Sequence, residues 1–214
     1  MELLEIMKNR RSVRTYTEES IPTEKLEQIL HAGLLSPSGR AIRPWELIVV
    51  QNKEMLQKLA GCRDGSADML KGASAAIVVA ADPDKTDVWI EDCSIAMTQM
   101  HLMADSLGVG SCWIQVRLRD AGKAAPAGTT TEGYLQGLLG IPKEYKVEAI
   151  LSLGMPKKHP APRTLEELPK EKIHWGKMNT SPLVSPAFSA FTASSSPAAD
   201  SGNMGIRSRM IPMV

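Results

Sequence analysis

The sequence is poor in aromatic residues and cysteines and contains no long apolar run. Aromatic residues make up 4% of its 214 residues, and Cys62, Cys93 and Cys112 show no C-x-x-C spacing. These features argue against a disulfide framework and a cysteine metal site, and a membrane-spanning helix would need a run of roughly 18 apolar residues. A net charge of +1 argues against nucleic-acid binding, which usually requires a clear basic excess. We therefore expect a globular cytoplasmic protein with buried free thiols, no metal, and no membrane or nucleic-acid partner.

Familiar catalytic motifs are also missing. There is no G-x-S-x-G and no H-E-x-x-H, and the four histidines are scattered, with His101 inside the strongest predicted helix. The only G-x-G, at residues 108–110, follows a predicted helix and precedes a predicted strand, which reverses the order of the dinucleotide-binding fingerprint. We therefore expect no catalytic side chain, a structural role for His101 and no Rossmann site.

Helices and strands alternate through most of the chain. Apolar spacing predicts helices over residues 2–9, after Pro22 with Thr23 as N-cap, over 53–61, over 87–107, and after a capping box of Thr129 and Glu132. Short apolar, β-branched runs predict strands over 46–51, 75–81, 111–116 and 147–153. This order is typical of helices packed on a sheet, but it does not determine the strand directions.

The end of the chain differs in composition from the rest. Residues 179–214 are rich in Ser, Pro and Ala, contain no lysine and one acidic residue, Asp200, and show no apolar periodicity. Such a segment buries too little apolar surface to offset the entropy cost of ordering it. We predict one domain over residues 1–178 and a disordered tail over residues 179–214.

Two short segments combine side chains that suit a phosphate-bearing ligand. Residues 10–14 hold three arginines around Ser12, and guanidinium groups match phosphate oxygens in a bidentate manner. The loop over residues 37–40 is small and rich in hydroxyl groups, so that its backbone can approach a ligand closely. Taken alone, the first segment also fits a solvated helix end, and the second also fits an ordinary turn.

Four motifs follow one another along residues 1 to about 176. The first predicted helix ends in R-R-S-x-R at residues 10–14, and residues 37–45 are similar to P-S-x-x-N-x-Q-P-W. The long helix runs into residues 108–115, which are similar to G-L-G-x-C-W-I-G, and residues 153–156 form a glycine-proline turn that is followed by Arg163. Together these motifs resemble the nitroreductase-like family of FMN-dependent oxidoreductases.

The resemblance implies an α+β fold, with a mixed β-sheet flanked by helices, in an intertwined homodimer that binds FMN at its interface. It implies that the arginine segment holds the phosphate and ribityl chain, that the loop at 37–40 comes from the partner subunit, and that the backbone at 113–115 flanks the reactive N5 edge. The cofactor-binding residues implied in this way are Arg10, Arg11, Ser12, Arg14, Pro37, Ser38, Gly39, Arg40, Trp113, Ile114, Gln115 and Arg163.

The function implied by the resemblance is an oxidoreductase in which FMN carries the chemistry. NAD(P)H would reduce the flavin, and a small organic acceptor such as a nitroaromatic or a quinone would reoxidise it, with ping-pong kinetics. Two alternatives stay open. Relatives of the same fold include dehalogenases and a flavin-cleaving enzyme, because a fold does not determine a reaction, and a flavin carrier without reductase activity would use the same binding residues.

Three positions depart from the family pattern. Ala41 stands where the family has asparagine, Arg43 where it has glutamine, and Gln115 where it has glycine. Ala41 removes a side-chain hydrogen bond, worth about 0.5–1.5 kcal/mol. Arg43 adds a cation, which would favour an anionic substrate if it faces the site. The departures therefore bear on the choice of substrate more than on the binding of FMN.

Overall fold

The computed structural model describes residues 2–178. By its internal contacts the chain divides into one unit, Met1–Glu167, and a second that begins at Leu168. The described part of the second unit, residues 168–178, contains one 3-10 helix, Lys170–Lys172. The tail predicted over residues 179–214 lies outside the described residues, and the domain boundary at residue 178 stays a prediction.

Four strands form the sheet in the order β1-β2-β4-β3, and each neighbouring pair is antiparallel. The two central strands are buried along almost their whole length, and the continuous apolar sequence of β2 predicts this for that strand. The α+β class is confirmed. Within residues 2–178 the only parallel element of the expected mixed sheet is a single bridge between Ser12 and Ser111. The strands are Trp45–Val50 (β1), Ala75–Ala81 (β2), Gly110–Gln115 (β3) and Lys146–Gly154 (β4).

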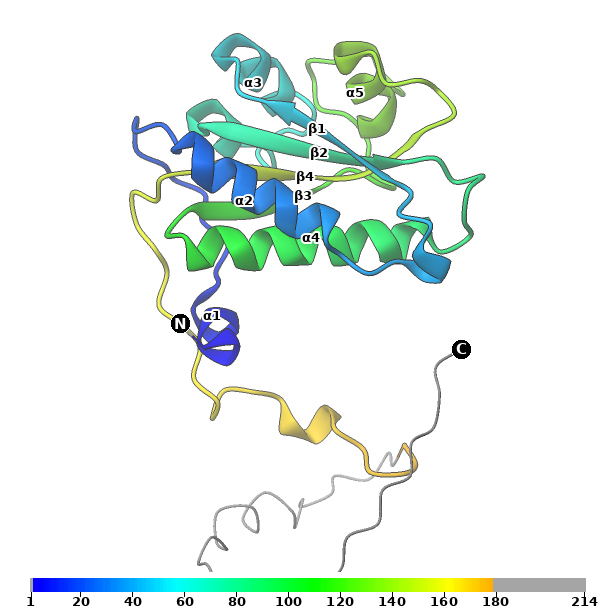
Figure 1. Ribbon diagram of the computed structural model, residues 1–214. Coiled ribbons are helices and arrows are strands. Elements are labelled where there is room, and N and C mark those ends of the chain that lie inside the picture. The colour runs from blue at the N-terminus through cyan, green and yellow to red at the C-terminus, as the bar shows by residue number, and fades with distance from the viewer. Residues whose placement is uncertain (1, 179–214) are drawn as a thin grey trace, which may run out of the picture. The chain divides into compact units, whose positions relative to one another are not determined.

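Helices cover both faces of the sheet (Figure 1). One core packs α2 and α4 against one face, and a second core packs α3 and α5 against the other. The first helix, α1, buries none of its residues. No helix described in residues 2–178 is long and apolar enough to cross a membrane. The helices are Leu3–Asn9 (α1), Thr23–Leu34 (α2), Lys53–Ala60 (α3), Trp89–Ser106 (α4) and Thr131–Leu139 (α5).

Two of the predicted helix caps were wrong by one residue. Thr23 is the first residue of α2 and follows Pro22, which has no side chain that caps the helix. Thr130 rather than Thr129 caps α5, and its hydroxyl accepts from the N–H of Gly133 at 3.0 Å. Glu132 does not complete a capping box, because its carboxylate accepts from the N–H of Val147 on β4 at 2.9 Å. A contact between distant strands and helices thus overrides the local capping pattern.

A β-bulge interrupts the pairing of β2 with β4. Val79 pairs with Ala149 and Ala80 pairs with Val147, which leaves Glu148 as the extra residue. The bulge places the carbonyl of Glu148 where it accepts from the N–H of Arg117 at 3.1 Å. Bulges often redirect a side chain next to a functional site, and this one buries a carboxyl group near the end of β3.

Two glycines let the N-terminal segment lie directly on the sheet. A Cβ atom on Gly110 would lie 2.8 Å from Cγ1 of Val13, and one on Gly154 would lie 2.5 Å from Cγ of Tyr16. The absence of side chains at both positions allows the close approach. The segment that follows α1 is therefore held against β3 and β4, and this contact positions the arginines of residues 10–14.

Candidate functional site

The predicted arginine segment runs from the end of α1 to the first residues of β3. Val13 is buried, and its N–H donates to the carbonyl of Ser111 at 2.9 Å. Successive side chains of an extended segment alternate in direction, so that Ser12 and Arg14 face away from the core that buries Val13. Arg14 is exposed and Ser12 is half-buried. Both side chains are therefore accessible to a ligand, as the resemblance implies.

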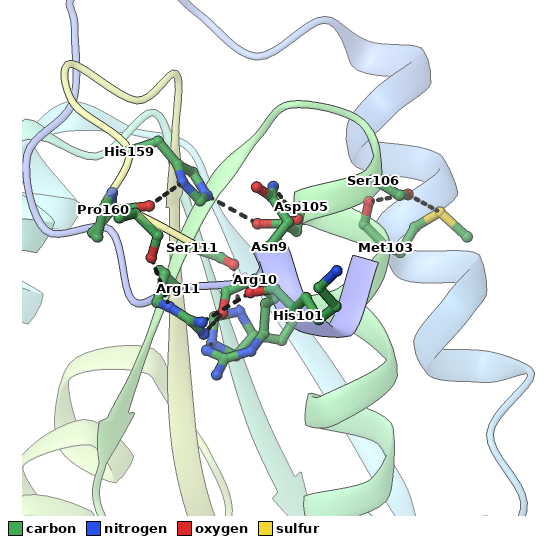
Figure 2. Close-up of polar contacts among 12 residues, drawn as sticks. Asn9, Arg10, Arg11, His101, Met103, Asp105, Ser106, Ser111, His159 and Pro160 are labelled. Atoms are coloured by element: carbon green, nitrogen blue, oxygen red, sulfur yellow. Dashed lines mark hydrogen bonds and ion pairs between the residues drawn. The ribbon is translucent and has the colours of Figure 1, made fainter. Parts of the chain in front are cut away.

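Arg10 is anchored to a histidine of α4 (Figure 2). Its Nη1 atom lies 3.2 Å from Nε2 of His101, and Nδ1 of His101 contacts Oγ of Ser111. A guanidinium group only donates, so we infer that Nε2 is the unprotonated acceptor and that Nδ1 carries the ring proton. Burial, and secondly the charge of Arg10, lower the pKa of His101 to about 4. The imidazole is therefore neutral at neutral pH.

A second set of contacts centres on Asp105, one turn further along α4. Its Oδ2 accepts from the amide of Asn9 at 2.8 Å, and its Oδ1 lies 3.0 Å from Nε2 of His159. Asp105 is 8% exposed. Figure 2 shows how this set lies beside the pair of Arg10 and His101. The carboxylate at this end of α4 is therefore engaged by residues other than an arginine.

The guanidinium of Arg11 is committed to the backbone. Its nitrogens donate to the carbonyls of Lys8 at 2.8 Å, of Arg10 at 2.5 Å and of Ala161 at 3.1 Å. The pKa of Arg11 is lowered by partial burial and then by the charges of Arg163 and Arg10. Arg11 therefore joins the N-terminal segment to residues near 161, and its charge adds to a local positive field.

Arg163 belongs to the same positive region. Its N–H donates to the carbonyl of Lys8 at 3.0 Å, and its side chain repels the guanidinium of Arg11. A hollow of about 630 Å³ lies beside it. We call Arg10, Arg11, Arg14 and Arg163 the arginine cluster. The charges of Arg10 and Arg163 act on Arg11 while Asp105 is engaged elsewhere, and such an arrangement fits a phosphate group.

The predicted loop over residues 37–40 lies at the opposite, N-terminal end of α4. The N–H of Gly39 donates to Oδ1 of Asp92 at 2.8 Å, and Arg40 forms an exposed ion pair with Asp87 at 3.3 Å. The loop is strained, because Arg40, Ala41 and Arg43 have φ angles of 53°, 56° and 52°. Residues with side chains rarely adopt this left-handed conformation, which concentrates at functional sites when the surroundings enforce it.

The predicted residues of β3 divide between the two faces of the sheet. Ile114 is buried in the core below α3 and α5, so that only its backbone could face a cofactor. Trp113 and Gln115 lie on the other face, where Nε1 of Trp113 donates to Oε1 of Gln115 at 2.9 Å. Burial raises the pKa of the neighbouring Glu148, while Arg117 and Gln115 oppose that rise. Gln115 thus connects an indole ring with a buried carboxyl group.

The structure brings together one part of the predicted site and leaves the other apart. The arginine cluster meets the start of β3 at the C-terminal end of α4, whereas the loop at 37–40 contacts Asp92 at its N-terminal end (Figure 1). Asp92 and Asp105 are separated by about 20 Å along the helix axis, because each residue adds about 1.5 Å. One chain therefore does not bring these two parts into one site.

Sequence reasoning missed several members of the polar network. Asn9, Asp105 and His159 were not singled out, and His101 was expected only to be structural. His101 and Asp105 are four residues apart on one helix, a spacing that places both on one face and could have drawn attention to them. No local signal connects His159 to this face, because its contact with Asp105 spans 54 residues.

Known proteins resemble the chain over most of its length. A sequence profile described as the Nitroreductase family matches residues 7–62 and 57–155. A protein of Archaeoglobus fulgidus, provisionally named NADH dehydrogenase/NAD(P)H nitroreductase, is 41% identical over 160 residues, which cover 73% of this chain and 86% of that protein. An FMN reductase (NAD(P)H) of Bacillus subtilis is 27% identical over 185 residues, which cover 81% of this chain and 72% of that protein.

Solved structures lead to the same family. An FMN-dependent nitroreductase from Clostridium difficile R20291 aligns with a TM-score of 0.77 at 41% sequence identity, and the alignment covers 82% of this chain and 99% of that one. The matching profile spans well over half of the sequence. The four motifs, the α+β fold and these similarities agree. The chain belongs to the nitroreductase family.

Proposed function

We propose that this protein is an FMN-dependent oxidoreductase that passes electrons from NAD(P)H to a small organic acceptor. The observation that carries the proposal is the arginine cluster, which gathers cations beside the start of β3 at a site suited to a phosphate. Relatives named for FMN-dependent nitroreductase and NAD(P)H-linked FMN reductase activity support it. The described residues also offer no group of His, Cys, Asp and Glu arranged to hold a metal ion.

The residues present fit FMN. Arg10 and Arg163 would hold its phosphate, Ser12 and Arg14 would hold the ribityl chain, and the backbone of residues 113–115 would flank the ring. When bound, FMN supplies the transfer of two electrons between NAD(P)H and the acceptor. The chain positions the cofactor and supplies positive charge around it. NAD(P)H and the acceptor would use the same face of the site in turn, which gives ping-pong kinetics.

A second copy of the chain would complete the site. The apolar residues Leu3, Leu4 and Met7 of α1 are 48–60% exposed, and α1 buries none of its residues within the chain. Exposed apolar surface of this kind marks an interface. The loop at residues 37–40 points to a partner for a second reason, since it lies far from the arginine cluster of its own chain. We therefore propose a homodimer in which each site draws on both subunits.

An anaerobic absorbance experiment tests the proposed reductase. The protein is incubated with FMN, freed of unbound cofactor and treated with NADH or NADPH. We expect a flavin spectrum that bleaches with the nucleotide and returns when a nitroaromatic or a quinone is added. A bound flavin that does not bleach would point to a carrier, and a protein that takes up no FMN would overturn the proposal. Parallel initial-rate lines at several acceptor concentrations would support ping-pong kinetics.

Mixed dimers test the site shared between two subunits. Arg10→Ala impairs the arginine cluster, and Gly39→Val impairs the loop, because a Cβ atom at residue 39 would lie 2.8 Å from Val88. Each homodimer should bind FMN poorly. A heterodimer of the two variants, purified through two different affinity tags, should have one intact site, formed by the unaltered half of each chain. Failure of the heterodimer to bind more FMN than either homodimer would exclude the shared site.

The cytoplasmic location stays a prediction. Its basis is the set of three thiols, Cys62, Cys93 and Cys112, which are all buried and free, as the sequence predicts. Burial raises the pKa of both Cys62 and Cys93 to about 12. These thiols are therefore packing residues with little thiolate character at neutral pH.

A further inference from the structure

Arg10 differs from the other arginines of the cluster in the kind of group that anchors it. Its side-chain hydrogen bond within residues 2–178 goes to a neutral imidazole nitrogen of His101 at 3.2 Å. The guanidinium of Arg11 donates its hydrogen bonds to backbone carbonyl groups. That of Arg14 contacts the carbonyl of Ser12 at 3.5 Å. His101 is 7% exposed and is one of the buried residues of α4. Arg10 is therefore anchored by the side chain of a buried histidine.

A carboxylate lies near the anchoring histidine, but its hydrogen bonds go to other partners. Asp105 lies one turn from His101 on the same face of α4, and its two oxygens contact Asn9 and His159 (Figure 2). Among the described residues, Arg10 takes part in none of the ion pairs. The arrangement keeps the negative charge of Asp105 out of direct contact with Arg10.

The difference between a neutral and a charged anchor matters for an anionic ligand. A carboxylate would orient a guanidinium but would also offset its charge and compete with a phosphate for its N–H groups. An imidazole nitrogen accepts one hydrogen bond and leaves the positive charge uncompensated. The contact of Nδ1 with Ser111 fixes the ring, because it holds the proton on Nδ1 and leaves Nε2 free to accept.

We propose that His101 is a positioning residue, whose neutral imidazole holds the Arg10 guanidinium in place as a full positive charge for the phosphate of the cofactor. The proposal rests on the proposed function, because it requires Arg10 to bind a phosphate. The charged groups that face the imidazole are Arg10 and Asp105, and Ser111 supplies the neutral contact. Burial and the charge of Arg10 both favour the neutral ring.

Three substitutions separate the parts of this proposal. His101→Gln keeps an acceptor near the position of Nε2 and loses the contact with Ser111. His101→Asn keeps a polar group near the position of Nδ1 and loses the contact with Arg10. His101→Glu keeps an acceptor for Arg10 but adds a negative charge. Comparing these variants distinguishes an anchor for Arg10 from a residue that only fills space, because all three remove the same imidazole ring.

The measurement is the dissociation constant of each purified full-length variant for FMN and for riboflavin, which lacks the phosphate. Unfolding midpoints in urea confirm that each variant folds. We expect His101→Gln to keep most of the preference for FMN over riboflavin. His101→Asn should lose roughly tenfold of that preference, because a hydrogen bond to a charged group is worth about this much. His101→Glu should lose at least as much as His101→Asn.

The ratio of the dissociation constants for FMN and riboflavin is informative, because the loss of a purely structural residue would weaken the binding of both ligands equally. A ratio that is unchanged in His101→Asn would overturn the positioning role. A ratio in His101→Glu equal to that of His101→Gln would overturn the claim that the charge must remain uncompensated. If the unaltered protein binds neither FMN nor riboflavin, the proposed function itself fails, and this outcome is distinct from both of the others.

Discussion

The two ends of α4 differ in whether their buried polar side chains have hydrogen-bond partners. At the C-terminal end, the side chains of His101 and Asp105 are paired with residues of the same chain. At the N-terminal end, Oδ2 of Asp92 and Oε2 of Glu148 are buried and have no hydrogen-bond partner within residues 2–178. The first end also rests on unstrained backbone, whereas the second carries a cluster of left-handed residues in the loop at 40–43.

This difference indicates what each end still requires. A buried polar atom without a partner costs about 1–3 kcal/mol, and such costs persist where function or another molecule compensates them. At the C-terminal end, His101 and Asp105 have their hydrogen-bond partners within one chain, and the arginine cluster is displayed to a ligand. The N-terminal end is incomplete in one chain, which agrees with the proposal that a second subunit and a cofactor meet there.

The largest expected difference between the two ends is the loss of folding stability that the C-terminal end causes at acidic pH. The folded protein holds His101 at a pKa of about 4, below the unfolded value of about 6.5. The unfolded chain therefore binds more protons between these values, and stability is lost as the pH falls from about 6.5 to 4. The difference of roughly 2.5 pH units corresponds to about 3 kcal/mol. Urea unfolding at several pH values should show this loss, and His101→Gln should remove most of it.

Arg10→Ala should weaken FMN binding roughly 100-fold, because it removes a partly buried guanidinium that is oriented for a phosphate. Arg40→Ala, at the other end of α4, should weaken it about threefold, since Arg40 is exposed and paired with Asp87. Lys143→Ala controls for the loss of one positive charge. Fluorescence titration of FMN measures all three. Equal losses for Arg10 and Arg40 would erase the distinction between the two ends.

Gly154→Ala tests the close approach that places the arginines. A Cβ atom there would lie 2.5 Å from the ring of Tyr16, and we expect a loss of about 2 kcal/mol in the free energy of unfolding. Binding of FMN should weaken as well, because the displaced segment carries the arginine cluster. Gly137→Ala is the control, since nothing lies within 4 Å of that position. Calorimetry and FMN titration on the same samples measure the two effects. A loss of stability without a loss of FMN binding would contradict the prediction.

At the other end of α4, Glu148 should give the original protein the opposite pH dependence, and Glu148→Gln should remove it. Burial raises the pKa of Glu148, so that the folded state binds more protons and stability falls as the pH rises above the unfolded value of about 4.3. The variant should therefore match the original protein in acid and exceed it by about 1 kcal/mol at pH 7. Unfolding at pH 4 and pH 7 tests the sign. Greater stability of the original protein at pH 7 would mean that the carboxylate is favourably paired.

Ala41→Gly should give the smallest effect. The left-handed backbone costs alanine about 1–2 kcal/mol, and the greater freedom of glycine in the unfolded chain offsets about 0.5–1 kcal/mol of the gain. We expect a net stabilisation of about 0.5 kcal/mol, measured by urea unfolding. Ala60→Gly in α3 is the matched control and should destabilise. A loss of stability in Ala41→Gly would show that the loop is not strained at this position.

The sequence was sufficient for the type and order of the main elements, whereas the site residues implied by the resemblance stay predictions. A continuous apolar run predicted β2 without error in its bounds. These features depend on a few neighbouring residues.

The rest depends on contacts between distant residues, which no local pattern encodes. The capping box failed because Glu132 bonds to β4, and Glu148 was missed because a bulge turned it inward. The network around His101 was missed because its members come from the end of α1, from α4, from β3 and from residues near 159. The separation of the loop at 37–40 from the arginine cluster became visible only with the length and direction of α4.

The bonds that join the two ends of the domain also determine when the site can form during synthesis. The contact of Arg11 with Ala161 spans 150 residues, and the N–H of Arg163 meets Lys8 across a similar interval. A growing chain contains α1 and its arginines long before residue 161 exists, and such distant contacts close late. We therefore expect the contacts that hold Arg11 against the C-terminal part of the domain to form only after residues 161–163 have been synthesised.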